Sequence, residues 1–330
     1  TWYNGFMPSF LVRTAARDYS CIVERGALRS LAAHLPPKSG KLFVVTTRDV
    51  WDLFAERFTE ALSPVPFDVL FFPGGEDRKR IAEVEALADQ MVQLGADRSS
   101  LAIAFGGGIV GDLTGFLAAT FMRGIHVIQV PTTLLAQVDA SIGGKTGANL
   151  VSGKNLIGAF HQPLAVLIDP DLVRTLSARE YRAGLYEVIK CGIIASPDLF
   201  EILLTDADRI LEMQPDLVEK IIAESVRIKA EVVSNDERES DLRRILNFGH
   251  TVGHALEAET SYARLLHGEA VAFGMRAASY LGHFLGVTTD QAHAQILSCI
   301  DAYGAIPDLA DIRAENLLSR LVSDKKTIQG

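Results

Sequence analysis

Short apolar runs alternate with longer amphipathic stretches in the first half of the chain. Each run is almost continuously apolar, which indicates strands buried on both faces of a sheet, and therefore parallel strands with helices packed over them. Residues 80–94 have helical spacing and lie between two of these runs, as a crossover helix should. The strands expected from the runs are residues 42–46, 67–72, 101–105, 127–130 and 165–168.

Helical periodicity replaces the strand pattern after residue 175. Apolar positions then recur with the spacing of amphipathic helices. The fold class expected is an α/β domain with a Rossmann-like sheet, residues 1–175, followed by an all-α domain, residues 176–330. The helices expected in the second domain are residues 178–194, 215–234, 247–259, 267–285 and 289–303.

The composition is that of an ordinary soluble globular protein, with 48% hydrophobic and 22% charged residues among 330. The formal net charge of -9 argues against nucleic acid or an anionic membrane as a partner. An anionic small molecule would therefore need a local cluster of Lys and Arg. Residues 101–122 are apolar enough to suggest a membrane span, but the glycines at 106–108 and Asp112 interrupt them. We expect a buried strand, a glycine turn and a helix there.

Cysteine usage indicates a reducing compartment. The three cysteines are scattered and odd in number, so we expect no disulfide framework. The first residues lack the basic and apolar regions of a secretion signal, and a cytoplasmic location is expected. Cys191 is either a reactive thiol or a buried packing residue, and its apolar neighbours favour packing.

The strongest chemical signal is a pair of histidines, His250 and His254, in the segment Asn-Phe-Gly-His-Thr-Val-Gly-His. Residues four apart share one face of a helix, and imidazole is the commonest protein ligand for zinc-like metals. His267 adds a third imidazole at the start of the next helix. Hydrogen-bonded core histidines are the alternative. The clustering of three of the eight histidines among small glycines favours a metal site.

A glycine-rich turn follows the strand 101–105. The spacing of Gly106, Gly108 and Gly111 fits the dinucleotide fingerprint, in which backbone amides and a helix N-terminus face a phosphate. However, the turn follows the third strand, not the first, and no carboxylate ends the next strand about twenty residues on. A nucleotide-binding turn and a tight structural turn both fit this pattern.

We expect two lysines to lie in glycine-rich loops, Lys145 in residues 139–147 and Lys154 in residues 153–155. Flexible backbone and an ammonium group together suit a phosphate or carboxylate ligand, and a solvated surface loop is the alternative. Glu187 and Lys190 are three apart on one helical face. They suit either a metal ligand with a neighbouring ammonium or a surface ion pair.

Taken together, these residues resemble the 3-dehydroquinate synthase family of sugar-phosphate cyclases. The resemblance implies an NAD-binding α/β domain and a metal-binding helical domain. It also implies the conversion of 3-deoxy-D-arabino-heptulosonate 7-phosphate into 3-dehydroquinate and phosphate, a step of the shikimate pathway to aromatic amino acids. In that reaction NAD oxidises the substrate transiently, phosphate is eliminated, the hydride returns, and ring opening precedes an intramolecular aldol step. The segments that carry the resemblance are residues 106–112, 131–155, 184–190, 236–257 and 267–275.

The resemblance also implies site residues, a divalent metal (zinc or cobalt) and a homodimer. Glu187, His250 and His267 match metal ligands, and His254 matches a contact to the substrate and its phosphate. Residues that match NAD contacts are Glu76, Lys79, Gly108, Asp112, Thr132, Thr133, Lys145, Lys154 and Thr175. Residues that match substrate contacts are Asp139, Lys145, Lys154, Asn155, Lys190, Lys229, Arg243, Asn247, one of Lys325 and Lys326, and Arg123, which the family lends across the dimer interface.

The chain departs from the family pattern beside the adenosine ribose. Thr47 stands where the family has an aspartate, and Asp49 replaces an asparagine. The alternatives to the main hypothesis are a sister cyclase for sedoheptulose 7-phosphate, glucose 6-phosphate or an amino analogue, a metal-dependent polyol dehydrogenase, and a silent NAD-binding or scaffold protein. The family pattern is kept at the positions that tend to change in sister cyclases, Lys229, Arg243, Asn247 and His254.

Overall fold

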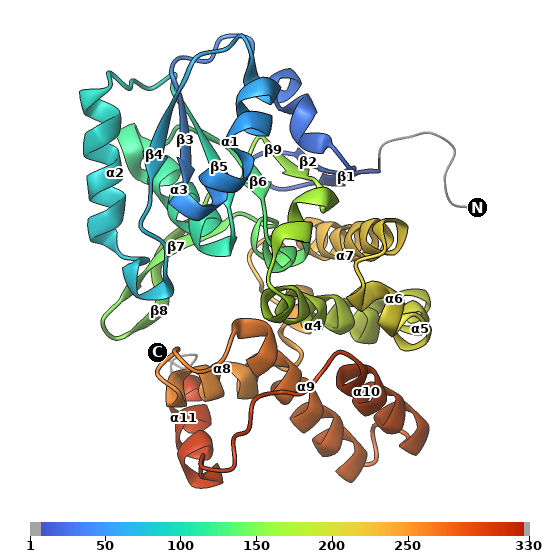
Figure 1. Cartoon of the computed structure of the whole chain (residues 1–330). Helices are drawn as coiled ribbons and strands as arrows, with labels where there is room; N and C mark the ends of the chain where they lie inside the picture. The colour runs from blue at the N-terminus through green and yellow to red at the C-terminus, as the bar shows by residue number, and fades with distance from the viewer. Residues whose placement is uncertain (1–7, 327–330) are drawn as a thin grey trace. The chain divides into compact units, whose positions relative to one another are not determined.

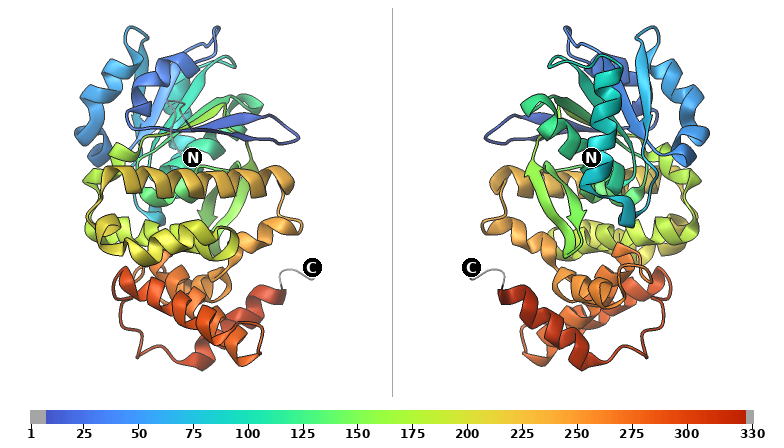
Figure 2. Two further views of the ribbon diagram at one scale, coloured as in Figure 1. Left: turned by 90° about the vertical axis from the view of Figure 1, so that its right-hand side faces the viewer. Right: turned by 90° about the vertical axis from the view of Figure 1, so that its left-hand side faces the viewer.

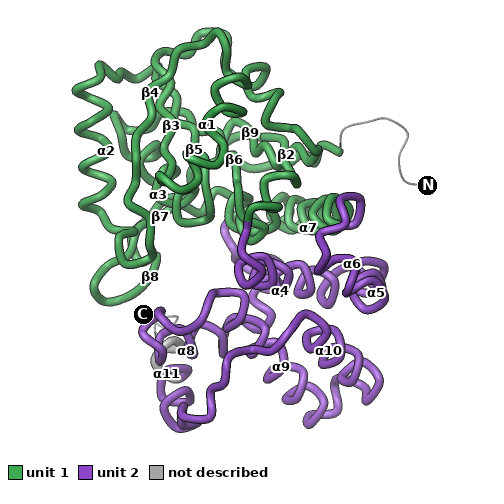
Figure 3. Tube along the Cα trace, in the orientation of Figure 1, with its two compact units in different colours: residues 1–175, 218–237 green, residues 176–217, 238–330 purple. Residues whose placement is uncertain are grey.

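The structure of the chain is a computed structural model that describes residues 8–326, with side chains up to residue 321. It divides into two compact units, shown in green and purple in Figure 3. Unit 1 comprises Thr1–Thr175 and Val218–Glu237, and unit 2 comprises Leu176–Leu217 and Arg238–Gly330.

Unit 1 is built on a seven-stranded sheet with the order β1-β2-β9-β6-β5-β3-β4. Neighbouring strands are parallel except for β1 and β2, which are antiparallel. All five expected strands are present, with bounds that differ by at most one residue. The strands are β1 (Ser9–Val12), β2 (Tyr19–Val23), β3 (Leu42–Thr46), β4 (Phe67–Phe71), β5 (Leu101–Gly106), β6 (His126–Pro131) and β9 (Ala165–Ile168).

Both faces of this sheet are buried, as the continuous apolarity of its strands predicts. In β3, Phe43 and Val45 enter the hydrophobic core on one face, whereas Leu42 and Val44 enter the core on the other. Successive side chains of a strand point to opposite faces, so both must be apolar. The helices over the sheet (Figure 1) are α2 (Ile81–Gln93) and α3 (Gly108–Thr120) for the first core, and α1 (Arg48–Leu62) and the 3-10 helix η1 (Ala27–His34) for the second.

A two-stranded hairpin corrects the expectation that Lys145 and Lys154 lie in loops. Lys145 begins β7 (Lys145–Leu150), and Lys154 lies in β8 (Gly153–Phe160), which pairs with β7. In the right-hand view of Figure 2 the hairpin lies beside α2. The glycines that suggested a loop instead allow the strands to approach, because a Cβ at Gly158 would lie 2.1 Å from the carbonyl oxygen of Thr146.

Helix α7 (Pro215–Asn235) is the difference from the two-domain division expected at residues 175–176. Residues 218–237, which include most of this helix, belong to unit 1. Polar contacts accompany its apolar packing there, since Lys229 Nζ donates to the carbonyl oxygen of Asp139 at 2.7 Å. Helical periodicity predicts that a helix forms but not which unit it packs against.

All the regular secondary structure in the described residues of unit 2 is helical. Helix α8 begins at His250, three residues later than expected, because Gly249 adopts a left-handed backbone (φ 81°) at its N-cap. The three cysteines of the chain are buried, and Cys191 is a packing residue as expected. The helices are α4 (Ala178–Ala195), α5 (Pro197–Thr205), α6 (Ala207–Leu211), α8 (His250–Glu259), α9 (His267–Phe284), α10 (Asp290–Ala302) and α11 (Ala314–Lys326), with the 3-10 helix η6 (Leu242–Asn247).

Within residues 8–326, no helix is both long enough and apolar enough to cross a membrane. The stretch 101–122 forms strand β5, the glycine turn and helix α3, as its interrupting glycines and Asp112 predict.

Candidate functional site

The glycine turn of unit 1 connects β5 directly to α3. Gly107 is the N-cap of α3, and no side chain caps the first N–H groups of this helix at that position. A Cβ at Gly108 would lie 3.1 Å from the Cβ of Ala140, so the turn is also closely packed. Thr132 follows β6, and its backbone N–H donates to Gly106 at 3.0 Å. The turn thus presents a helix N-terminus at the carboxyl edge of the sheet, where α/β folds bind anionic ligands.

A buried lysine joins predicted residues from separate elements of unit 1. Lys79 is 3% exposed, and its Nζ lies 2.5 Å from Asp112 Oδ2 and 2.6 Å from Asn155 Oδ1. Burial raises the pKa of the Asp112 carboxyl, and the ammonium of Lys79 opposes that shift. Glu76 begins the adjacent 3-10 helix η2 (Glu76–Arg78). The structure therefore gathers Glu76, Lys79, Asp112 and Asn155.

A second ion pair in unit 1 joins Asp139 and Lys229. The ammonium of Lys229, on α7, contacts both the carboxylate and the backbone oxygen of Asp139. Asp139 lies in the short π-helix η4 (Ala136–Ala140). Such π-helical turns are rare and often mark functional sites.

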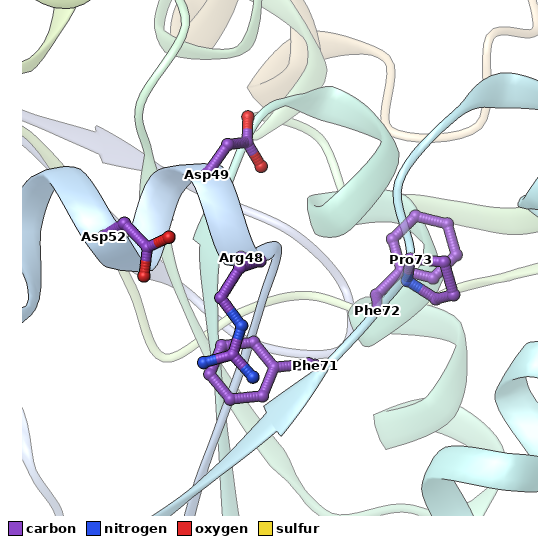
Figure 4. Close-up of a pocket in the computed structure, with 6 residues that line it drawn as sticks. All are labelled: Arg48, Asp49, Asp52, Phe71, Phe72 and Pro73. Atoms are coloured by element: carbon purple, nitrogen blue, oxygen red, sulfur yellow. The ribbon is translucent and has the colours of Figure 1, made fainter.

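A hollow lies at the carboxyl ends of β3 and β4 (Figure 4). The guanidinium carbon of Arg48 lies 3.5 Å from the centre of the Phe71 ring, a cation–π contact. Asp49 and Asp52 project from α1 beside it. This is the edge of the sheet where parallel α/β folds take their ligands. The lining residues are Arg48, Asp49, Asp52, Phe71, Phe72 and Pro73.

Arg123 is exposed on a strained turn after α3. Met122 and Arg123 have φ values of 48° and 71°, the left-handed region that non-glycine residues seldom adopt. Strain of this kind persists where the surroundings fix it, often at functional positions. The remaining predicted residues of unit 1 lie on separate elements. Thr133 precedes η4, and its Oγ1 accepts a hydrogen bond from the backbone N–H of Ala136. Lys145 and Lys154 lie in the hairpin, and Thr175 ends the 3-10 helix η5 (Pro170–Thr175).

In unit 2, Glu187 and two histidines converge from three helices. Glu187 Oε1 lies 3.6 Å from His250 Nε2 and 3.7 Å from His267 Nε2. His254 belongs to the same cluster, since ligand atoms of the three histidines lie within 4.8 Å of one another. Glu187 is only 1% exposed. Two imidazoles and a carboxylate are a donor set that zinc and cobalt accept, with positions left for other ligands.

Neighbouring groups orient the imidazoles of His250 and His267 toward Glu187. The carbonyl oxygen of Phe248 lies 3.3 Å from His250 Nδ1, and Glu257 Oε2 lies 3.2 Å from His267 Nδ1. Both contacts direct the Nε2 atoms toward Glu187, as second-layer partners of metal histidines commonly do. Burial lowers the pKa of His250 to about 4, so its imidazole is neutral at pH 7.

Glu257 was missed in the sequence, although the signal was present. It lies seven residues after His250 and three after His254, so all three share one face of α8. Lys190 was predicted, and its Nζ donates to Glu187 Oε2 inside α4. Both members of this pair are buried, which excludes the alternative of a surface ion pair.

The 3-10 helix η6 carries Arg243 and Asn247. Arg243 is 2% exposed, and the Asn247 amide donates to Glu239, a residue that sequence reasoning also missed. Lys325 and Lys326 end α11, and their side chains lie outside the described residues.

Comparison with known proteins matches this chain along its length. Family models described as 3-dehydroquinate synthase N-terminal and C-terminal match residues 69–183 and 184–327. The 3-dehydroquinate synthase of Solibacter usitatus is 65% identical over 324 residues, covering 98% of this chain and 91% of that protein.

Two solved structures share the fold at lower identity. A 2-deoxy-scyllo-inosose synthase complexed with carbaglucose-6-phosphate, NAD+ and Co2+ has a TM-score of 0.88 at 28% identity, covering 96% of this chain and 89% of that chain. The 2-epi-5-epi-valiolone synthase of Streptomyces hygroscopicus, with NAD+ and Zn2+ bound, has a TM-score of 0.87 at 29% identity and the same coverage. The resemblance seen in the sequence is confirmed, and the chain belongs to the 3-dehydroquinate synthase family.

Proposed function

We propose that this chain is a carbon–oxygen lyase that converts 3-deoxy-D-arabino-heptulosonate 7-phosphate into 3-dehydroquinate and phosphate. The observation that carries the proposal is the 65% identity to a 3-dehydroquinate synthase over 98% of the chain. The 2-deoxy-scyllo-inosose synthase and the 2-epi-5-epi-valiolone synthase compared above are only 28% and 29% identical to this chain. This reaction needs a divalent metal and NAD. The buried carboxylate and histidines of unit 2 would bind the metal, and the glycine turn of unit 1 would bind NAD.

The metal ligands that we propose are Glu187, His250 and His267. Three protein ligands leave positions open for vicinal hydroxyls of the substrate. His254, on the same face of α8 as His250, would then contact the substrate and its phosphate. Lys190 holds the second oxygen of Glu187, which leaves Oε1 directed at the imidazoles. When bound, the metal would polarise a substrate hydroxyl and NAD would accept and return a hydride.

NAD would bind at the carboxyl edge of the sheet in unit 1. The backbone N–H groups in the first turn of α3, which starts at Gly108 and has no side-chain cap, suit the pyrophosphate of NAD. The hollow beside Arg48 suits the adenosine half of NAD. Asp49 lines that hollow and would supply a carboxylate for the adenosine ribose in place of the family aspartate that Thr47 replaces. The further NAD contacts that we propose are Glu76, Lys79, Asp112, Thr132, Thr133, Lys145, Lys154 and Thr175.

Basic side chains would hold the anionic substrate. A chain of formal net charge -9 attracts a phosphate and a carboxylate only where cations are concentrated locally. Lys229 is ordered by Asp139, and Arg243 is buried, so neither is an ordinary solvated helix charge. The substrate contacts that we propose are Asp139, Lys145, Asn155, Lys190, Lys229, Arg243, Asn247, His254, one of Lys325 and Lys326, and the partner's copy of Arg123.

The function is tested by incubating the chain with the heptulosonate phosphate, NAD and zinc or cobalt. We expect release of one phosphate per dehydroquinate formed, with no net accumulation of NADH because the hydride is returned. A polyol dehydrogenase would accumulate NADH in proportion to product. A sister cyclase would turn over sedoheptulose 7-phosphate, glucose 6-phosphate or the amino analogue instead. No dehydroquinate from metal-loaded protein, with an authentic synthase as positive control, would overturn the proposal.

We further propose a cytoplasmic homodimer in which Arg123 serves the partner's site. Its exposed, strained position suits a contact outside its own subunit. An Arg123→Ala variant mixed with a His250→Ala variant should therefore recover activity, because each mixed dimer contains one site with both residues. Equal exchange between twofold dimers predicts about a quarter of the wild-type rate. Each variant incubated alone is the control. No recovery after mass spectrometry verifies subunit exchange would contradict the shared site.

A further inference from the structure

Asn149 lies where the β7–β8 ladder is interrupted. Ala148 pairs with Ile157 and Leu150 with Gly153, so the ladder register shifts around Asn149. Three residues of β8, including Lys154 and Asn155, therefore lie opposite one residue of β7. Irregularities of this kind re-aim side chains and are common beside active sites. Within this interruption Asn155 has a left-handed backbone (φ 53°), which a regular hairpin strand would not allow.

The side chain of Asn149 fastens this interruption to η2. Its Oδ1 accepts the backbone N–H of Asn155 at 2.8 Å, and its Nδ2 donates to the backbone oxygen and Oε1 of Glu76 at 3.0 and 2.7 Å. The backbone N–H of Asn149 donates to the carbonyl oxygen of Lys79 at 2.7 Å. Asn149 is 5% exposed. The amide orientation is fixed, because an N–H of Asn155 must face an oxygen and a carbonyl of Glu76 must face a donor.

The hydrogen bonds of Asn149 hold residues that we propose as contacts of NAD or of the substrate. Asn155 has a left-handed backbone (φ 53°). This conformation costs conformational free energy, so it persists where surrounding contacts stabilise it. Its Oδ1 in turn accepts from Lys79 Nζ at 2.6 Å, beside Asp112. Asn149 thus closes a loop of hydrogen bonds that runs through Glu76, Lys79 and Asn155.

We infer that Asn149 is a positioning residue that sets the Asn155 side chain for the substrate and the Glu76–Lys79 segment for the dinucleotide. The inference rests on the proposed function, which places Asn155 at the substrate and Glu76 and Lys79 at NAD. An amide meets both demands at once, since its nitrogen donates on one side and its oxygen accepts on the other. An aspartate keeps the acceptor for Asn155 but sets a carboxylate against that of Glu76.

The test compares Asn149→Ala and Asn149→Asp in the metal-loaded full chain. We expect Asn149→Ala to lower kcat/KM for the sugar phosphate about tenfold to hundredfold and to weaken NAD binding about tenfold, because misplacement by a fraction of an ångström suffices. Asn149→Asp should weaken NAD binding as much as Asn149→Ala does, but it should raise the KM for the sugar phosphate less than Asn149→Ala does. Metal content, a property of unit 2, should stay at the wild-type level in both. Asn235→Ala, an exposed amide on α7 whose Nδ2 bonds only its own helix backbone among the described contacts, is the matched control.

A double-mutant cycle separates positioning from a general loss of folding. In Glu76→Gln protein, an aspartate at 149 regains a donor from the glutamine amide, so Asn149→Asp should cost several-fold less in NAD affinity than it does in the wild-type background. An equal cost in both backgrounds would overturn the inference, as would wild-type kinetics and NAD affinity in folded Asn149→Ala. If wild-type protein binds NAD yet forms no dehydroquinate, the proposed function fails while the NAD cycle still tests Asn149. Should Asn149→Ala not fold, the cycle with the aspartate carries the test.

Discussion

Replacing His250 by alanine is expected to strip the divalent metal from the protein, whereas replacing His254 is expected to leave it bound. Glu187 Oε1 lies within 3.6 Å of His250 Nε2, and His250 is neutral at pH 7 because burial lowers its pKa to about 4. Removing its Nε2 would leave two of the three proposed protein ligands, too few for a stable site of this type. His254 would contact the substrate phosphate, so its loss should weaken turnover and substrate binding without releasing metal.

Metal analysis after chelator-free purification and dialysis checks this prediction. We expect His250→Ala to hold almost no metal and to lose about a thousandfold in kcat, equivalent to ~4 kcal/mol of transition-state stabilisation. His254→Ala should retain near-stoichiometric metal. His283→Ala is the matched control, because His283 lies on α9 with His267 but its Nδ1 faces Asp290 instead of the other three histidines. Equal metal loss from His250→Ala and His254→Ala would assign both histidines as ligands.

That experiment also decides whether His254 is a metal ligand, which neither the sequence pattern nor the structure determines. Helical spacing places His250 and His254 on one face, and the structure keeps all three histidines within 4.8 Å. Neither observation removes His254 from the ligand set. Glu187 joins the cluster from α4, far away in sequence, and only the family resemblance predicted that partnership. The ligand set therefore stays a prediction, with Glu187 Oε1 facing two imidazoles as its structural support.

The parallel sheet was predictable because its strands leave an unambiguous mark. Burial on both faces forces continuous apolarity, and β3 and β9 match their expected bounds residue for residue. The β7–β8 hairpin left no such mark, because its glycines serve close strand approach and resemble a loop. The role proposed for Asn149 could not be predicted from the sequence either, because it depends on hydrogen bonds to Glu76 and Asn155 that form only in the folded chain.

Glycine packing between α8 and α9 was hidden for the same reason. A Cβ at Gly274 would lie 1.8 Å from the carbonyl oxygen of Gly249 and 3.0 Å from the backbone nitrogen of Gly253. The two helices touch through backbone atoms, so no side-chain rotation can relieve a clash there. Gly249 is the N-cap of α8, directly before His250. The distance between α8 and α9 thus also sets where the first turn of α8, with the imidazole of His250, can lie.

Substitution Gly274→Ala is therefore expected to destabilise unit 2 by about 3 kcal/mol, the upper part of the range for overpacking, and to weaken metal binding. Thermal unfolding should shift down by roughly 10 °C, with faster hydrogen exchange in α8 and α9. Gly286→Ala is the matched control: it adds the same methyl group at φ 71° with nothing within 4 Å, so it should cost only the left-handed strain, about 1 kcal/mol. If both substitutions cost the same, helix separation does not limit this unit. If Gly274→Ala loses stability but keeps wild-type metal affinity, α8 can move without moving His250, and the link between packing and metal site fails.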